Sequence, residues 1–172
     1  MAKPLKIPYE EALAGIQKEK HWTAGGEIEW VQTSVNHWPF AYKHRSVLRV
    51  GNVLAEGLMV QLEYKGGVIE DLPERLCFTL LVGGARVFGI DEDGVTRHVN
   101  RVGIGQPFYQ QTIGHPHIHL PVPEASYGYA EPIDRVPVEM LWQSFLERAN
   151  ILDGPRLNLP GMERPDGQLR LI

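Results

Sequence analysis

The sequence is poor in cysteine and has no long run of apolar residues, and both absences narrow the class of protein. A single thiol, Cys77, cannot form an internal disulfide. Because Cys77 lies in the apolar segment 76–82, we expect a buried structural thiol in a cytoplasmic protein. No segment is long and apolar enough to cross a bilayer, and the first residues lack the apolar core of a signal peptide. We therefore expect no membrane association.

Several signatures of known catalytic sites are also missing. There is no HExxH zinc-protease pattern, no P-loop or Rossmann glycine pattern, and no GxSxG nucleophile elbow. The formal net charge of −4 is not that of a strongly basic nucleic-acid binder, although a nucleic-acid site needs only a local positive patch. Any chemistry must therefore come from residues outside these patterns.

Apolar periodicity predicts a single α+β domain. We expect a short helix over 8–20 and strands over 27–35, 47–50, 58–64, 76–82, 85–90 and 95–99. Gly83-Gly84 and Asp93-Gly94 are hairpin signals, which favour an antiparallel meander. A β-sandwich or a small barrel is the alternative.

One amphipathic helix is expected to cover a face of this sheet. Asp134 is a candidate N-cap, and Asp153-Gly154-Pro155 is a stop signal. The apolar stripe between them consists of Val138, Leu141, Trp142, Phe145, Ala149 and Leu152. We expect residues 1–154 to form the domain and residues 155–172 to be a loosely held tail.

The feature that carries chemistry is a row of alternating histidines, His115, His117 and His119. Side chains on a strand point alternately to opposite faces, so the three imidazoles share one face and the apolar residues between them share the other. We expect the apolar face to pack on the core and the imidazoles to line an open surface or a cleft. Imidazoles near neutral pH ligate metals and transfer protons.

Zinc or another divalent metal is the first candidate ligand of this row. Two histidines two residues apart are well placed to share an ion, so His117 and His119 form the centre of the predicted site. His115 is a further candidate ligand, but its Cα lies roughly 13 Å from that of His119 on a regular strand, close to the limit that two imidazoles can span. A third ligand from elsewhere is expected instead, and the candidates are His98, Glu124 and Asp91.

Two other interpretations stay open. The histidines could act as general acid and base in RNA cleavage, with the RNA supplying its own 2′-hydroxyl as the nucleophile. They could also be the polar side of an ordinary half-buried strand. Prolines at 116, 121 and 123 cannot donate to a ladder, which places this strand at a sheet edge where a protein partner could dock.

Four short motifs stand out together: Arg86-Val-Phe-Gly-Ile-Asp91, His98-Val-Asn100, Gly114-His-Pro-His-Ile-His119 and Tyr127-Gly-Tyr-Ala130. In these motifs the chain resembles a group of small, poorly characterised bacterial and phage domains, to which a set of toxin-like members of toxin–antitoxin pairs is related. The resemblance implies a compact α+β domain, a cytoplasmic or mobile-element setting, and a centre at His98, His117 and His119. The long loop 103–114 and the longer C-terminal region depart from the pattern.

The leading hypothesis is a small cytoplasmic hydrolase, in particular a toxin-like nuclease. His98, His117 and His119 would form its centre, and Glu124 would orient an imidazole or act as a base. The partner would then be RNA. The competing hypothesis is a non-catalytic phage or plasmid factor that binds a host protein through the proline-rich strand edge.

Overall fold

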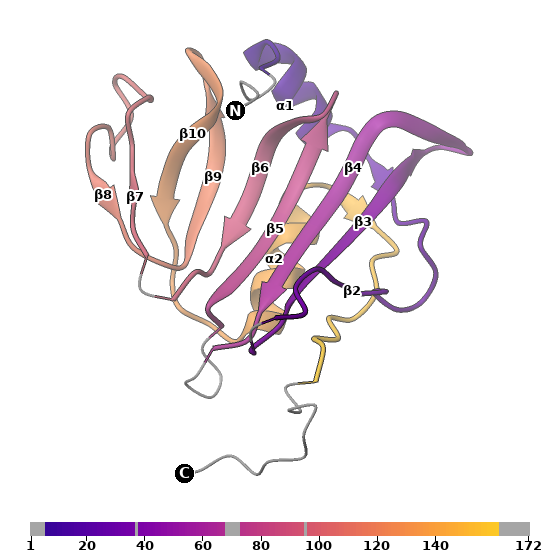
Figure 1. Cartoon of the computed structure of the whole chain (residues 1–172). Coiled ribbons are helices and arrows are strands. Elements are labelled where there is room, and N and C mark those ends of the chain that lie inside the picture. The colour runs from indigo at the N-terminus through magenta and orange to yellow at the C-terminus, as the bar shows by residue number, and fades with distance from the viewer. Residues whose placement is uncertain (1–5, 37, 68–72, 95, 162–172) are drawn as a thin grey trace.

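An antiparallel sheet dominates the computed structural model, which describes residues 6–36, 38–67, 73–94 and 96–161 (Figure 1). Within these ranges the elements are α1 (Tyr9–Gln17), β1 (Lys20–His21), β2 (Val31–Gln32), β3 (Ala41–Val50), β4 (Val53–Lys65), β5 (Arg75–Val82), β6 (Ala85–Asp91), β7 (His98–Val99), β8 (Thr112–Ile113), β9 (His117–Val122), β10 (Ala125–Pro132), α2 (Val138–Arg148) and β11 (Ile151–Leu152). The α+β class predicted from the sequence is confirmed. No helix in the described ranges is long and apolar enough to span a membrane.

The large sheet is curled into a half-barrel. Its strands follow the order β10-β9-β6-β5-β4-β3-β1-β11, and β2 pairs with β3 at the side. Strands β3 to β6 are neighbours in both the chain and the sheet, which confirms the predicted meander. The prediction of a second hairpin at Asp93-Gly94 is wrong, because β6 pairs with β9 instead of with the segment 95–99. Two distant parts of the chain therefore meet at the β6–β9 ladder.

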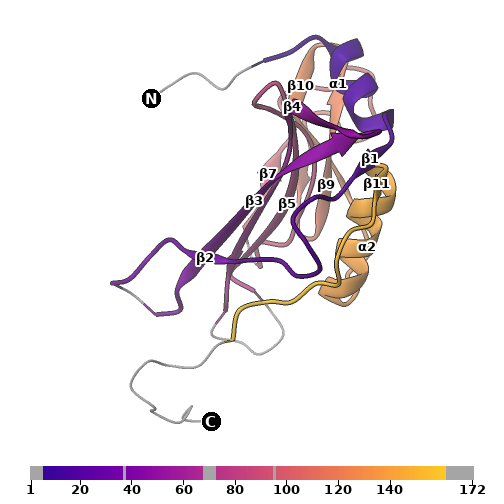
Figure 2. The same ribbon diagram turned by 90° about the vertical axis from the view of Figure 1, so that its right-hand side faces the viewer.

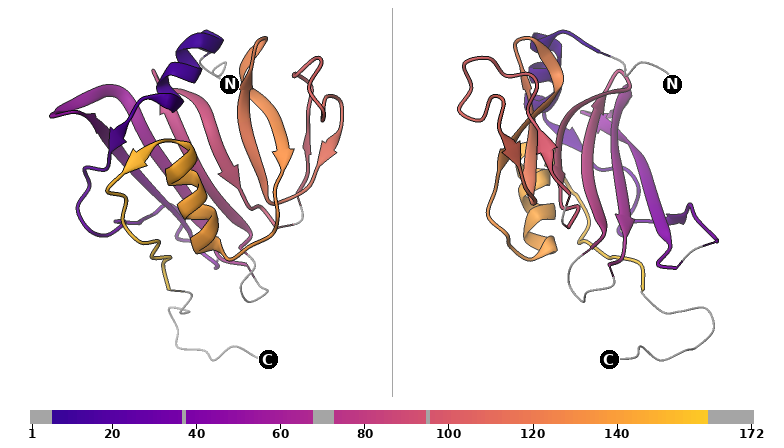
Figure 3. Two further views of the ribbon diagram at one scale, coloured as in Figure 1. Left: turned by 180° about the vertical axis from the view of Figure 1, so that it is seen from behind. Right: turned by 60° about the vertical axis from the view of Figure 1, so that its left-hand side comes forward.

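Helix α2 covers one face of the sheet, as predicted, and β1 and β11 lie on the same side as the helix (Figures 2 and 3). Its apolar stripe buries Trp142 and Phe145 completely. The Phe145 ring lies 5.7 Å from that of Phe88 on β6, and the Trp142 ring lies 5.1 Å from that of Phe78 on β5. Burial of such rings supplies much of the stability of a domain of this size. The other face of the sheet is turned away from α2 and carries the histidines.

Both helices are shorter than the sequence patterns indicate. Helix α2 begins after Pro137 instead of at Asp134, because a proline disfavours helical dihedrals in the residue before it and suits the first turn of a helix. Helix α1 ends at Gln17. The buried Lys20 ammonium donates hydrogen bonds to carbonyl groups at the end of α1, at 2.8 Å to Gly15 and 2.9 Å to Ile16. Burial lowers the pKa of Lys20 to about 8.

The segment 27–35 forms far less strand than its alternation predicts. Only β2 pairs, and Ile28 is held instead by the C-terminal region, where the Asn158 side chain exchanges two hydrogen bonds of 3.1 Å with its backbone. Asn158 lies in the part of the chain that we expected to form a loosely held tail. The remainder of that predicted tail, 162–172, lies outside the described residues.

A loop between β7 and β8 is attached to the outer side of β10. The side chain of Asn100 is fully buried. Its amide makes the two hydrogen bonds that a neighbouring strand would make with Ala130: it donates to the Ala130 carbonyl at 2.8 Å and accepts from the Ala130 N–H at 2.7 Å. It also donates to the Phe108 carbonyl at 2.8 Å. These bonds fix the two-stranded sheet β7–β8 beside the large sheet and bring His98 toward β9.

Candidate metal centre

Three side chains with metal-binding atoms converge where β6 meets β9. In the antiparallel register Asp91 lies opposite His117, and Gly89 lies opposite His119. Residues directly opposite each other share a face, so Asp91, His117 and His119 all point away from α2. Ile90 and Ile118 pair in the same ladder and take the core face. The alternation of histidines and apolar residues predicted for this strand is therefore confirmed for His117 and His119.

The donor atoms of this group, here called the Asp91–His117–His119 trio, are very close together. The Nε2 atoms of the two histidines lie 2.9 Å apart. Asp91 Oδ2 lies 3.1 Å from Nε2 of His119 and 3.8 Å from Nε2 of His117. Within the described ranges, this is the one set of three histidine, cysteine or acidic residues whose ligand atoms all lie within 4.8 Å of one another.

The trio is buried, which corrects the expectation of an open row of imidazoles. His117 and His119 are each only 2% exposed. The rings of His98, His115 and Tyr127 pack against the two imidazoles, so this face of β9 is covered as well as the face that packs on the core. A His117→Ala variant would therefore leave a cavity and lower the stability of the fold.

Hydrogen bonds around His117 direct one nitrogen toward the trio. Its Nδ1–H donates to the Gly114 carbonyl at 2.8 Å, which leaves Nε2 as the unprotonated nitrogen that faces His119 and Asp91. Histidines that bind metals are usually held in this way through the outer nitrogen. The Nδ1 atom of His119 is buried and has no hydrogen-bond partner among the described residues.

Arg86 holds the outer oxygen of Asp91. Its Nη2 lies 2.6 Å from Asp91 Oδ1, while Oδ2 faces the histidines. Burial alone would raise the pKa of Asp91, but the Arg86 guanidinium and the hydrogen bond with His119 together outweigh burial and hold that pKa well below its usual range. The carboxylate is therefore ionised at neutral pH, with Oδ2 directed at the histidines.

Both imidazoles of the trio are neutral at physiological pH. Burial, with a smaller contribution from His119, lowers the pKa of His117 to about 3. Burial also lowers the pKa of His119, against the opposing effect of its hydrogen bond with Asp91. Neutral imidazole is the form that binds metals.

His98 lies beside the trio without belonging to it. Its ring is 4.9 Å from that of His119 and 5.6 Å from that of His117. Its Nε2–H donates to the Gly128 carbonyl at 2.9 Å, so Nδ1 is the nitrogen that remains as an acceptor.

His115 lies outside the trio as well, although its ring is 4.1 Å from that of His117. Its Nδ1 accepts the Asp93 N–H at 3.1 Å, and its Nε2 pairs with the Thr96 hydroxyl at 2.9 Å. It precedes β9, and its two nitrogens are occupied in holding the turn after β6. Of the three candidate third ligands, it is Asp91 that meets His117 and His119.

Glu124 lies at the other end of the β9–β10 hairpin. Its carboxylate accepts backbone hydrogen bonds from Gly103 at 2.7 Å and from Ile104 at 2.6 Å. These bonds lower the pKa of Glu124. The structure therefore places Glu124 as an anchor of the long loop, and the trio forms without it.

The prediction of an edge position for the histidine strand is wrong. Strand β9 pairs with β6 on one side and with β10 on the other. Its ladder with β6 covers only His117 to His119, so Pro121 lies beyond the bonds that a proline would interrupt. The strand edge on which the partner-docking hypothesis depended is therefore occupied by β10.

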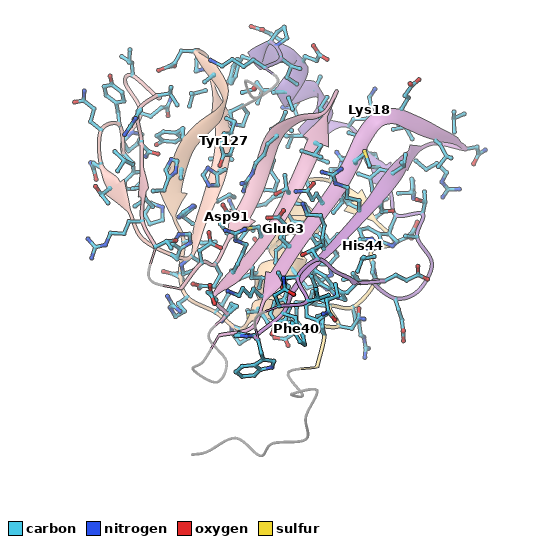
Figure 4. The ribbon with its side chains drawn as sticks, viewed as in Figure 1. Lys18, Phe40, His44, Glu63, Asp91 and Tyr127 are labelled. Carbon is cyan, nitrogen blue, oxygen red and sulfur yellow. The ribbon has the colours of Figure 1, made fainter. Side chains whose placement is uncertain are left out.

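Sequence reasoning missed two neighbours of the trio, Arg86 and Tyr127, as functional residues. The Tyr127 ring stacks on His119 with centroids 4.9 Å apart, and the Arg86 guanidinium lies 4.9 Å from the centre of the same tyrosine ring. Figure 4 labels Asp91 and Tyr127 on the face of the sheet that is turned toward the viewer, with α2 behind. Both missed residues stand within the stretches that carried the family resemblance, and this was the one signal that pointed to them.

Comparisons of the chain with protein-family models, with curated proteins and with solved structures find no match. The resemblance to toxin-like domains stays a prediction. The chemistry must therefore be argued from the trio and its surroundings.

Proposed function

We propose that the chain is a metal-dependent hydrolase that holds one divalent first-row transition ion, such as zinc, on Asp91, His117 and His119. The observation that carries this proposal is the convergence of two imidazole nitrogens and one carboxylate oxygen within 4.8 Å in a buried site. Two histidines and one carboxylate are a donor set common to catalytic zinc and non-haem iron sites.

The size of the donor triangle supports such an ion. From the separations of 2.9, 3.1 and 3.8 Å, the point equidistant from the three atoms in their plane lies about 1.9 Å from each, near the 2.0–2.1 Å typical of zinc–nitrogen bonds. The two imidazole nitrogens and the carboxylate oxygen would supply three ligands of such an ion, and water or a substrate would supply the rest.

The neutral state of the two imidazoles favours a metal-dependent reaction over metal-free acid–base cleavage. A general acid at neutral pH must carry a proton that it can donate. Both imidazoles of the trio have lowered pKa values, and each Nε2 faces another metal-binding atom.

His98 supports hydrolysis as the reaction. A metal-bound water needs a base nearby when it attacks a substrate. The hydrogen bond from His98 Nε2–H to Gly128 leaves Nδ1 able to accept a proton, and the ring lies 4.9 Å from that of His119. The finer proposal is a nuclease in which the bound ion activates water, His98 accepts its proton and RNA is the substrate.

The test combines metal analysis with a hydrolysis assay on tag-free protein purified without chelator. We expect about one zinc, manganese or iron ion per chain by plasma mass spectrometry, lost in Asp91→Asn and retained in the remote histidine control His21→Gln. His98→Gln should keep the ion and lose cleavage of single-stranded RNA and of bis(p-nitrophenyl) phosphate. Circular dichroism checks that each variant is folded.

The possible outcomes separate the two parts of the proposal. No bound ion after incubation with zinc refutes the metal centre. A stoichiometric ion without cleavage of either substrate leaves the metal centre standing and refutes the hydrolase. Cleavage that persists unchanged in a folded, metal-free Asp91→Asn variant would favour the acid–base alternative.

A further inference from the structure

Arg86 reaches the trio because of an irregularity in β6. Five residues separate Arg86 from Asp91, so regular alternation would place the two side chains on opposite faces of the sheet. The β5–β6 register shifts between Leu80 and Leu81, where one extra residue of β6 is inserted. A bulge of this kind re-aims side chains, and here it turns Arg86 to the face that carries Asp91.

Gly89 opens the path for the guanidinium. A Cβ at this position would lie 2.5 Å from Nη2 of Arg86 and 3.1 Å from its Nε. The arginine side chain therefore passes directly over the Gly89 backbone, between the bulge and the Asp91 carboxylate. A side chain at position 89 would block the contact with Asp91.

Arg86 and Tyr127 together connect two members of the trio. Nη2 of Arg86 contacts Asp91 at 2.6 Å, and Nη1 donates to the Tyr127 hydroxyl at 3.3 Å. The Tyr127 ring in turn stacks on His119. The side chain that fixes the carboxylate ligand is thus packed through one aromatic ring against an imidazole ligand.

Besides positioning Asp91, the Arg86 guanidinium changes the charge of the metal-loaded centre. A divalent ion, the Asp91 carboxylate and two neutral imidazoles sum to one positive charge. The Arg86 guanidinium lies 2.6 Å from Asp91 Oδ1 and adds a second positive charge beside the ion. At a buried site the electrostatic attraction for an anion is strong.

We propose that Arg86 is a positioning residue that acts through Asp91 and raises the positive charge of the metal-loaded centre, and that the exogenous ligand of the centre is a phosphate-type oxyanion. This inference rests on the proposed metal centre and names its ligand class. Phosphate monoesters, phosphodiesters and inorganic phosphate share the required chemistry: an anionic oxygen that binds the ion in place of water.

The probe is inorganic phosphate titrated into the cobalt(II)-loaded protein, followed by the visible absorption of the cobalt. We expect phosphate to change the spectrum of the wild type. Arg86→Gln should weaken phosphate binding by about 10-fold or more, because it removes a charge-assisted contribution near the ligand. Arg86→Lys, which keeps the charge, should recover most of that loss. The exposed Arg45→Gln is the charge-matched control and should behave like the wild type.

The outcomes distinguish this inference from the metal centre on which it rests. Failure of the wild type to bind cobalt refutes the centre itself. Cobalt binding with equal phosphate affinity in the wild type and Arg86→Gln overturns the role of Arg86. If Arg86→Gln does not fold, the wild type still decides the ligand class: phosphate should bind at least about 10-fold more tightly than neutral imidazole, and equal affinities would overturn the proposal.

Discussion

Acidification should destabilise the metal-free protein because His117 is held neutral in the folded chain. His117 has a pKa of about 3 in the folded chain and an ordinary value of 6.5 when exposed. Between these values the unfolded chain binds a proton that the folded chain does not. The contribution of His117 to the free energy of unfolding is therefore fully present above pH 6.5 and is lost as the pH falls toward 3.

The size of this loss of stability follows from the difference between the folded and unfolded pKa values of His117. One such group changes the free energy of unfolding by up to about 1.4 kcal/mol per pH unit, or about 3 kcal/mol between pH 6.5 and 4. His119, whose pKa is also lowered, adds to the slope. Asp91 acts in the same direction only below its ordinary pKa of 3.8, because its folded pKa is lower still. Burial raises the pKa values of Glu92 and Asp93, and both groups act in the opposite direction, so a His117 variant is needed to isolate the contribution of the histidine.

Urea denaturation at intervals from pH 7 to 4, with chelator present, measures this effect. His117→Gln is the matched variant because glutamine is polar and does not titrate. Its slope should be smaller than that of the wild type by up to about 1.4 kcal/mol per pH unit. Equal slopes in the wild type and in His117→Gln would refute the assignment of His117 as a buried neutral imidazole.

Four further predictions follow from particular contacts. Trp142→Ala should lower the free energy of unfolding by about 3–5 kcal/mol in urea titrations, because the ring is fully buried. Gly89→Ala should lower the thermal midpoint and shift the cobalt spectrum, because the new methyl displaces Arg86. Asn100→Ala should speed amide exchange in the loop between β7 and β8, since three hydrogen bonds are lost. Zinc at 100 times its Kd should add about 2.7 kcal/mol of stability to the wild type and none to Asp91→Asn.

Local patterns in the sequence were sufficient to predict much of the fold. The stripe around Trp142 and Phe145 identified α2 and the face that it buries. The apolar run 76–82 identified a central strand, because a strand covered on both sides has no need for alternation. Helix ends were less predictable: Asp134 has the chemistry of an N-cap, but the dihedral restriction imposed by Pro137 decides where α2 begins.

Only part of the candidate site could be predicted from the sequence. Alternation placed His117 and His119 on one face, and Asp91 was one of three possible partners. The partner is decided by the β6–β9 ladder, which joins segments 26 residues apart in the register Asp91–His117, and no local pattern encodes that pairing. The contact of Arg86 with Asp91 could not be predicted for a different reason. Simple alternation assigns Arg86 to the wrong face of the sheet, and the bulge beside it has no clear sequence signature.

The side chain of Asn100 has a consequence for how copies of this protein behave toward one another. Strand β10 is the last strand on its side of the sheet, and such a strand offers free N–H and C=O groups on which another chain can assemble. The Asn100 amide occupies both groups of Ala130 and fastens a loop over them. The opposite border, β11, is only two residues long. Each border of the large sheet is thus a poor template for intermolecular strand pairing and aggregation.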